Sequence, residues 1–317
     1  MTTMMTLNDC IAYLKQNDGY LLITHIRPDG DTLGSAAALC HILRQMGKTA
    51  YLYDNPQVTE KYAPWVAPYI APADFVPSCT VAVDLAAENL FPEGFEESSI
   101  DLCIDHHPTN SEYAARLLCK PEKASCGEII LELAKLAVGQ IDQATANLLY
   151  IAVSTDCGCF MFANTTGDTH RAAAELIEAG ADHQGLNNAL FRTFSYSRLI
   201  LEGMIYTDMK RYGEDGGVVV ATVTLDMMAR SGATENDCDD LASLAGRVEG
   251  CSVAVTIREL QQGLCKISMR SGDNFDSSAV CALHGGGGHR RASGCTIEGT
   301  PEEVRDIIVR DILEAAN

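Results

Sequence analysis

Residues 20–35 read Tyr-Leu-Leu-Ile-Thr-His-Ile-Arg-Pro-Asp-Gly-Asp-Thr-Leu-Gly-Ser. An apolar run of strand length opens this stretch, and His25, Asp29 and Asp31 follow it. An Ala- and Leu-rich segment then predicts a helix over 32–46. A buried strand followed by a helix is the repeating unit of a parallel α/β sheet. We therefore expect an α/β fold in which polar side chains gather at the carboxyl end of a strand.

Short apolar runs and helical periods alternate throughout the first half of the chain. Further strands are predicted at 49–53, 80–83, 101–104 and 151–153, and further helices at 127–138, 143–150 and 169–179. This alternation predicts a doubly wound, mainly parallel sheet in a domain covering residues 1–190. Residues 191–214 are expected to form a connecting helix and linker.

Beyond residue 214 the pattern is typical of a smaller α/β domain with a mixed sheet, covering 215–317. Strands are predicted at 218–225, 251–260 and 264–270, and helices at 235–248, 277–283 and 301–315. Gln261-Gln-Gly263, between two of these strands, is a hairpin signal. Two domains also agree with the length of 317 residues, at roughly 150 residues per domain.

The charge balance narrows the function classes. The chain has 23 Lys and Arg against 43 Asp and Glu, a formal charge of −20. Such a surface repels long polyanions, which argues against a protein that coats long duplex nucleic acid. A small phosphorylated substrate is compatible with it, because bound divalent cations reverse the local field.

No membrane or secretion signal is visible in the sequence. No apolar stretch approaches the roughly 18 residues needed to span a bilayer, and residues 1–10 lack the pattern of a secretory signal. The 13 Cys are odd in number and scattered, mostly in apolar surroundings. We expect a bacterial-type cytoplasmic protein with free thiols and no membrane partner.

Acids and histidines follow the other predicted strands of the first domain. Asp84 follows 81–83, and Asp156 follows the run at 151–153. Asp105, His106 and His107 belong to the end of the run at 102–104. Because the carboxyl ends of parallel strands share one edge of the sheet, these side chains should converge with His25, Asp29 and Asp31.

This convergence indicates a metal site. Asp29, Asp31, Asp84 and Asp156 carry four negative charges, which two divalent cations would balance. His25 and His106 add imidazole ligands, and mixed oxygen and imidazole ligation suits manganese, with iron, cobalt, zinc and magnesium as alternatives. Adjacent His106 and His107 should point apart, so that only one of them ligates a metal.

The structural alternative is helix capping. An isolated Asp at a strand end is more often an N-cap, and Asp31 and Asp156 both fit that role. A lone His25 would more often be structural. Capping requires neither paired histidines nor Asp-x-Asp, so the coincidence of four such ends favours a dinuclear metal site.

Five motifs carry a resemblance to a known family. They are His25-Ile-Arg-Pro-Asp-Gly-Asp-Thr-Leu-Gly-Ser35, Val83-Asp84, Ile104-Asp-His-His107, Ser154-Thr-Asp-Cys-Gly158 and His284-Gly-Gly-Gly-Gly-His-Arg-Arg-Ala-Ser-Gly294. The first four resemble the motifs of the DHH phosphoesterases, and the fifth resembles the glycine-rich signature of their associated C-terminal domain. The two-domain pattern is most similar to the NrnA-type oligoribonucleases, which also dephosphorylate 3′-phosphoadenosine 5′-phosphate (pAp).

The resemblance assigns a role to each candidate site residue of the first domain. It implies two manganese ions held by His25, Asp29, Asp31, Asp84, His106 and Asp156, with Asp84 bridging the ions. It places His107 close to the scissile phosphate and makes Asp105 the partner that orients a histidine. Cys157 stands where the family commonly has Thr, and Cys159 follows. We interpret both thiols as packing, with a soft metal site as the alternative.

The second domain offers an anion site. Gly286, Gly287 and Gly288 expose backbone N–H groups that can donate hydrogen bonds to phosphate oxygens. His289 adds a directional donor, and Arg270 with Ser271 adds a bidentate cation and a hydroxyl. A flexible loop is the alternative interpretation of a Gly run.

The sequence thus predicts manganese-dependent hydrolysis of short nucleotides, namely oligoribonucleotides and pAp, by water activated between two metals. A cyclic-di-AMP or linear dinucleotide phosphodiesterase is the nearest alternative, and a non-catalytic nucleotide sensor is the alternative of another class. A RecJ-type exonuclease would need a basic channel, and a family pyrophosphatase would carry a basic cluster instead of the Gly run. The order of substrates stays open, as does assembly, for which a homodimer is one alternative.

Overall fold

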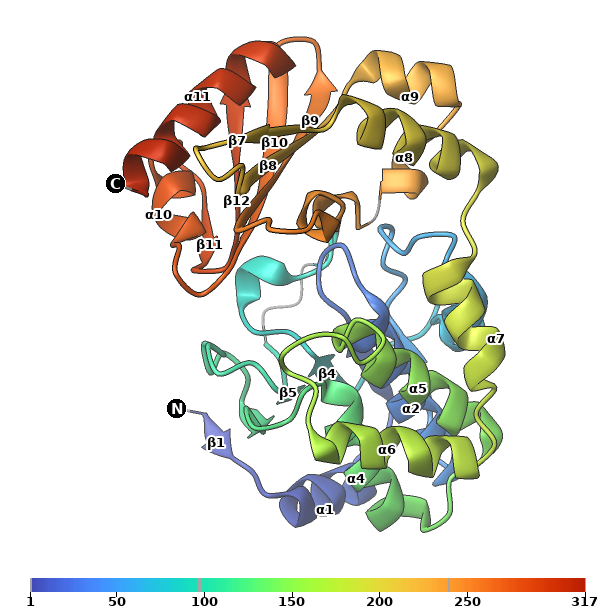
Figure 1. The fold of residues 1–317 in the computed structure, drawn as a ribbon. Coiled ribbons are helices and arrows are strands. Elements are labelled where there is room, and N and C mark those ends of the chain that lie inside the picture. The colour runs from blue at the N-terminus through green and yellow to red at the C-terminus, as the bar shows by residue number, and fades with distance from the viewer. Residues whose placement is uncertain (1, 96–98, 239, 317) are drawn as a thin grey trace. The chain divides into compact units, whose positions relative to one another are not determined.

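The computed structural model describes residues 2–95, 99–238 and 240–316 (Figure 1). The chain forms two compact units, Met1–Thr193 and Phe194–Asn317. In the described part of the chain, no helix is both long enough and apolar enough to cross a membrane.

The first unit is built on a six-stranded sheet in which every paired strand is parallel. Its strands are β1 (Thr3–Met4), β2 (Tyr20–Ile23), β3 (Ala50–Leu52), β4 (Cys79–Val83), β5 (Leu102–Asp105) and β6 (Arg116–Cys119). The strand order is β1-β6-β5-β4-β2-β3. Successive strands are therefore added on one side of β2 up to β3 and on its other side from β4 onward, so the strand order reverses between β2 and β4. Such a switch point leaves a crevice at the carboxyl ends of the strands, where ligands bind in open α/β sheets.

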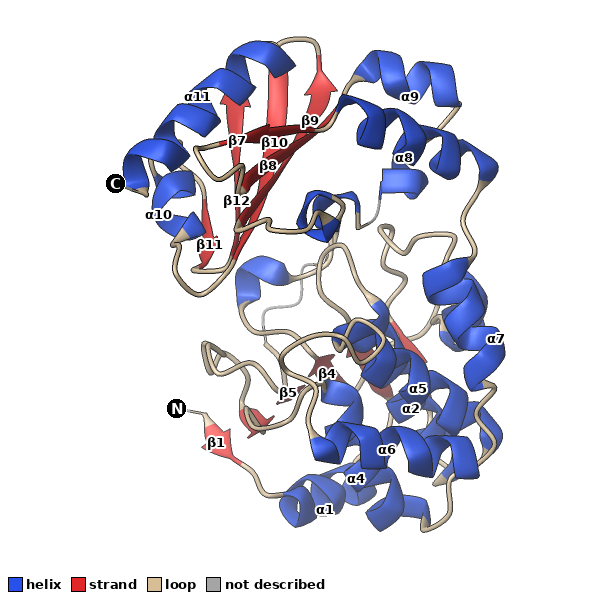
Figure 2. Ribbon diagram, viewed as in Figure 1, coloured by secondary structure: helices blue, strands red, loops and turns tan. Residues whose placement is uncertain are grey.

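Helices lie on one face of this sheet, some against the strands and others against those helices (Figure 2). They are α1 (Leu7–Gln16), α2 (Gly30–Gln45), α3 (Ala63–Val66), α4 (Cys126–Val138), α5 (Gln143–Asp156), α6 (Gly167–Glu178) and α7 (His183–Asn187). Leu22 and Val81 point into the core that these helices share with the sheet. Ile23 and Ala82 point to the opposite face and pack with Leu85 and other side chains of the segment between β4 and β6. The parallel α/β sheet confirms the fold class expected of this unit.

The strand expected at 151–153 is wrong. These residues continue α5, which starts after the N-cap Asp142 and runs to Asp156. The helix packs against both α2 and α4, so Ile151, Ala152 and Val153 are all buried. A helix buried on most of its surface has no polar face, and a short apolar run within it looks like a buried strand. Asp156 is consequently at a helix end rather than at a strand end.

Gly34 permits a close approach between α2 and α5. A Cβ atom added at this position would lie 2.5 Å from the carbonyl oxygen of Leu148, which is backbone and cannot rotate away. We expect Gly34→Ala to destabilise the fold by about 1–3 kcal/mol through overpacking. Urea unfolding measures this change. Gly203→Ala, in a helix where an added Cβ meets nothing within 4 Å, should be neutral or stabilising; equal losses in both variants would contradict the packing explanation.

The second unit contains a mixed sheet of order β11-β12-β10-β9-β8-β7. Its strands are β7 (Lys210–Tyr212), β8 (Val218–Val223), β9 (Val253–Gln261), β10 (Leu264–Ser271), β11 (Gly287–His289) and β12 (Ala292–Glu298), and its helices are α8 (Tyr196–Asp208), α9 (Leu225–Ser231), α10 (Ser277–Ala282) and α11 (Pro301–Ala315). Only the β8–β9 pairing is parallel among the described strand pairs. Helices α10 and α11 pack on one face and α8 on the other. This confirms the expected smaller α/β domain with a mixed sheet.

The helix expected at 235–248 is replaced by short 3₁₀ turns. They span Glu235–Cys238, Leu241–Ser243 and Ala245–Arg247, and Asp239 lies outside the described residues. Asp240 adopts a positive φ of 59°, which a continuous α-helix does not allow. The acidic side chains of this segment favour turns over helix interior because they hydrogen bond local backbone.

Candidate active site

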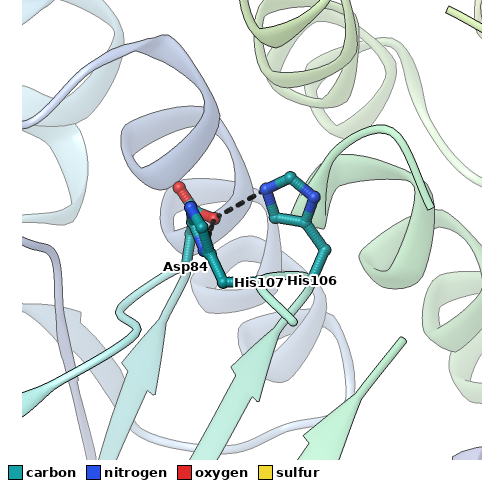
Figure 3. Close-up of side chains that lie close together, drawn as sticks. All are labelled: Asp84, His106 and His107. Carbon is teal, nitrogen blue, oxygen red and sulfur yellow. Dashed lines mark ion pairs between the residues drawn. The ribbon is translucent and has the colours of Figure 1, made fainter. Parts of the chain in front are cut away.

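Asp84 lies at the centre of a cluster of carboxylates and imidazoles in the first unit. It follows β4 directly, in the left-handed backbone region with φ 56°, and its N–H donates to the carbonyl of Ile104 at 2.9 Å. Oδ2 lies 4.0 Å from Nε2 of His25. Oδ1 faces His106 (Figure 3), whose Nε2 lies 3.4 Å away. The two oxygens of one buried carboxylate therefore face two different histidines.

The other predicted carboxylates complete two groups around Asp84. Nε2 of His25 lies 3.7 Å from Asp29 Oδ1. Nε2 of His106 lies 3.8 Å from Asp31 Oδ2 and 3.9 Å from Asp156 Oδ2. Within each group, His25–Asp29–Asp84 and Asp31–His106–Asp156, one atom from each residue lies within 4.8 Å of the others. The structure thus brings together all six residues predicted to bind metal, although they span more than a hundred positions.

Two of these carboxylates also cap helices. Asp29 is the N-cap of α2, and its Oδ1 accepts the N–H groups of Asp31 and Thr32. Asp31 accepts the N–H groups of Cys126 and Gly127 at the start of α4, at 2.7 and 2.9 Å. Capping and metal binding were alternatives in the sequence. In the structure, capping instead fixes the orientation in which each carboxylate meets the cluster.

Backbone carbonyls orient both histidines of the cluster. Nδ1 of His25 lies 2.8 Å from the carbonyl of Ile26, and Nδ1 of His106 lies 3.2 Å from that of Lys123. With Nδ1 occupied by a carbonyl, each ring presents Nε2 to the carboxylates. This is the arrangement by which proteins fix the tautomer of metal-binding histidines.

Asp105 holds His107 beside the cluster. Oδ1 of the buried Asp105 lies 2.7 Å from Nδ1 of His107 and accepts the N–H groups of His106 and His107. Oδ2 accepts Nδ2 of Asn110 at 2.6 Å. His107 Nδ1 also lies 3.6 Å from Asp84 Oδ1, and the ring remains partly open to solvent. The expectation that His106 and His107 point apart is wrong, because both rings face Asp84 and their centroids are 4.6 Å apart. Asn110 was not identified from the sequence, because its sequence context does not distinguish it from an ordinary turn residue.

Asn164 is a second polar residue that sequence reasoning missed. Its Nδ2 donates to the carbonyl of Asp156 at 3.1 Å, to Asp156 Oδ2 at 3.3 Å and to the carbonyl of Ala124 at 3.1 Å. It therefore ties the carboxylate at the end of α5 to the segment before α4. Cys157 is fully buried, which supports the interpretation of this thiol as packing.

The crowding of like charges perturbs the acids of the cluster. Burial, together with the charges of Asp84 and Asp156, raises the pKa of Asp31 well above its usual range. Burial is also the main cause that raises the pKa of Asp156 to about 7. Each site needs compensating positive charge because several carboxylates share a buried volume.

The pKa values of the two histidines are raised as well, which favours their charged form. Burial by itself would lower the pKa of His25, but the adjacent Asp29 outweighs it and raises the pKa to about 9. Burial likewise opposes protonation of His106, whereas Asp84, Asp31 and Asp156 raise its pKa to about 10. Protons on the imidazoles thus supply positive charge to the cluster.

These pKa shifts predict proton-coupled metal binding. At pH 7 both histidines are protonated, and an imidazole must lose that proton before Nε2 binds a metal. Manganese affinity should therefore rise between pH 6 and pH 9, by about one log unit per pH unit for each proton displaced. Titration calorimetry in two buffers of different ionisation heat counts the released protons. Affinity independent of pH over this interval would contradict the histidine ligation.

The donor set fits divalent cations. Oδ1 of Asp84 is a buried oxygen without a hydrogen-bond partner among the described residues, and such an acceptor is costly to bury unless a cation or donor faces it. Carboxylate and imidazole ligands in this ratio suit manganese, iron, cobalt or zinc.

The predicted anion-binding residues of the second unit meet at the edge of its sheet. Arg270 on β10 pairs with Ala292 on β12, and Ala292 pairs with His289 on β11. Directly paired residues project from the same face of a sheet, so Arg270 and His289 flank the small Ala292. Both are exposed. A cationic and an imidazole side chain therefore stand on one face beside the Gly run, and Nη1 of Arg270 donates to the carbonyl of Met269 at 3.0 Å.

The Gly run is more ordered than a flexible loop. The N–H of Gly286 donates to the carbonyl of Cys281, and residues 287–289 form β11. Ser271 donates its hydroxyl to the carbonyls of Phe275 and Arg290, so its donor is used within the fold. Arg291 forms an ion pair with Asp273.

Comparison with known proteins identifies the family. Residues 20–153 match the DHH family, N-terminal domain, and residues 215–316 match the DHHA1 domain. A Thermus thermophilus protein named bifunctional oligoribonuclease and PAP phosphatase NrnA is 33% identical over 290 residues, covering 90% of this chain and 86% of the relative. A Bacillus subtilis protein of the same name is 25% identical over 295 residues, covering 91% and 92%.

A solved structure has the same fold over both units. The crystal structure of an exopolyphosphatase-related protein from Bacteroides fragilis has a TM-score of 0.84 at 21% identity, covering 97% of this chain and 95% of that chain. The fold, the site and the relatives define a hydrolase acting on phosphoester bonds. The chain belongs to the DHH family and carries a DHHA1 domain, as its motifs predicted.

Proposed function

We propose that this protein is a manganese-dependent phosphoesterase that hydrolyses short oligoribonucleotides and converts pAp to AMP. The observation that carries the proposal is Asp84, whose two oxygens face two histidine–carboxylate groups suited to two cations. The names of the Thermus and Bacillus relatives support the substrate class. All thirteen cysteines are free thiols, which supports action in the reducing bacterial cytoplasm.

In this proposal each site residue of the first unit has a defined role. His25, Asp29 and Asp84 hold one divalent ion, and Asp31, Asp84, His106 and Asp156 hold the other. Divalent ions held there would acidify the attacking water and neutralise charge on the phosphoryl oxygens. Asp105 fixes Nδ1 of His107, so Nε2 remains free to hydrogen bond a phosphoryl oxygen or to protonate the leaving oxygen. Asn110 keeps the Asp105 carboxylate in place.

Residues 215–317 act as the substrate-binding domain. Arg270 and His289 anchor a phosphate other than the one being cleaved, with the backbone of Gly287 and Gly288 beside them. The acidic surface disfavours long strands, so the preferred substrates carry few phosphates. A homodimer is compatible with this assignment.

A substrate panel tests the proposed function. Purified protein with manganese is incubated with pAp, linear dinucleotides, five-nucleotide RNA, a long single strand and cyclic di-AMP, and products are separated by chromatography. We expect AMP from pAp and mononucleotides from the short RNAs, with rates falling on the long strand. Preferred cleavage of cyclic di-AMP would instead favour the dinucleotide signalling phosphodiesterase, and binding without turnover would favour a nucleotide sensor.

A further inference from the structure

The loop after α5 carries an exposed aromatic side chain and is tied at both ends to Asp156, one of the predicted metal ligands. It leaves from Asp156 and returns to it, because Asn164 donates to both the carbonyl and the carboxylate of Asp156. Between these two points lie Phe160, Met161 and Phe162. Phe160 belongs to the core, where its ring stacks on His170 at 5.2 Å and 25°. Met161 and Phe162 instead are 79% and 57% exposed.

Two hydrogen bonds fix the backbone of the loop at Phe162. The N–H of Phe162 donates to the carbonyl of Cys157 at 3.1 Å, and its carbonyl accepts the N–H of Thr165 at 3.1 Å. The ring lies over Gly158, where an added Cβ atom would be 2.4 Å from the ring atom Cζ. Glycine therefore leaves room for the ring two positions after Asp156.

The backbone of this loop is strained, which points to a purpose beyond connection. Gly158, Cys159 and Phe160 have φ values of 53°, 54° and 66°, and left-handed conformations are unfavourable for Cys and Phe. Such conformations persist where the surroundings enforce them, and they concentrate at functional sites. The N–H of Cys159 donates to the carbonyl of Ser154 at 2.7 Å, which supplies part of that enforcement.

We propose that Phe162 is a stacking platform for the nucleobase of the substrate. This proposal rests on the proposed function. The metal-binding cluster consists of carboxylates and imidazoles, which suit a metal-bound phosphate rather than an apolar base. The exposed ring of Phe162, on a loop tied to Asp156, has the flat apolar face that every base can stack on, without selecting one base over another. The loop thus adds affinity for nucleotides over other phosphoesters.

Comparing pAp with its abasic counterpart, ribose 3′,5′-bisphosphate, tests this proposal. With the manganese-loaded full chain, phosphate release gives kcat and KM for both compounds. Phe162→Leu keeps an apolar side chain over Gly158 but lacks the ring face, and it should raise KM for pAp roughly tenfold. KM for the abasic compound should not change. Phe162→Tyr should restore the KM for pAp, and Met161→Ala is the matched control on the same loop.

The outcomes separate the platform from other roles. Equal losses on both compounds, or failure of Phe162→Tyr to restore KM, would assign Phe162 to loop structure and overturn the proposal. An unchanged KM for pAp in Phe162→Leu would also overturn it. A wild-type protein that cleaves bis-p-nitrophenyl phosphate but no nucleotide would refute the proposed function itself. Thermal melting of each variant reports whether it is folded.

Discussion

Asp84→Asn should reduce kcat by at least about 10³-fold on every substrate, including bis-p-nitrophenyl phosphate. The substitution keeps the shape of the side chain but removes the charge that faces both His25 and His106. Losing a single preorganised electrostatic contact in an active site costs about 10²- to 10³-fold, and here one carboxylate serves both groups. Asn also tolerates the left-handed backbone of this position, with φ 56°, so the fold should survive.

Metal analysis by equilibrium dialysis and steady-state rates measure this effect. Asp84→Asn should weaken both manganese sites, whereas His25→Ala should mainly weaken one. Asp101→Asn is the matched control, because that side chain accepts the N–H of Thr80 near the start of β4, at the other end of the strand. A variant at Asp84 that still binds two ions and turns over at the wild-type rate would refute the dinuclear site.

Arg270→Ala should separate substrate capture from chemistry. Losing a charge-assisted hydrogen bond costs roughly 1.5–3 kcal/mol, so kcat/KM for pAp should fall about 10- to 150-fold at ~1.4 kcal/mol per tenfold. Manganese binding should not change, because every proposed ligand lies in the first unit. Hydrolysis of bis-p-nitrophenyl phosphate should also survive, since it has no second phosphate to anchor.

The neighbouring Arg291 provides the control for this experiment. Arg291 is exposed and already forms an ion pair with Asp273, so Arg291→Ala should alter kcat/KM for pAp much less than Arg270→Ala. His289→Ala should behave like Arg270→Ala, because both residues flank Ala292 on one face. If Arg270→Ala impaired both substrates equally, the residue would act on the chemistry or on folding, and the anchoring role would be wrong.

Local sequence signals predicted most of the elements that surround the site. The closing helix occupies Pro301–Ala315 as its period indicated, and the apolar runs before Asp84 and Asp105 form β4 and β5. Short elements with weak patterns were missed, among them β1 and β6. Helix α1 was missed as well, although Thr6 and Asp9 form a capping box at its start.

Asp156 was predicted as a site residue for a reason that was partly wrong, since the element before it was predicted as a strand. Its predicted place at a strand end is wrong, but the C-terminal end of α5 brings it to His106 all the same. Periodicity cannot distinguish a strand from a helix that is buried on most sides. The packing of α5 against α2 and α4 explains the helix, because most of its side chains are buried there.

The sequence by itself determined which chemical groups the site contains. Four aspartates and two histidines in recognisable motifs specify hard cation ligands, because charge and ligand type belong to the residues themselves. Only the tertiary structure decided how these groups face one another. The two oxygens of Asp84 reach two histidines because the order of β2 and β4 creates a switch point, and Asn110 and Asn164 orient carboxylates through hydrogen bonds that carry no sequence signature. Such contacts depend on how close two residues lie in space, and their separation along the chain does not determine how close they lie.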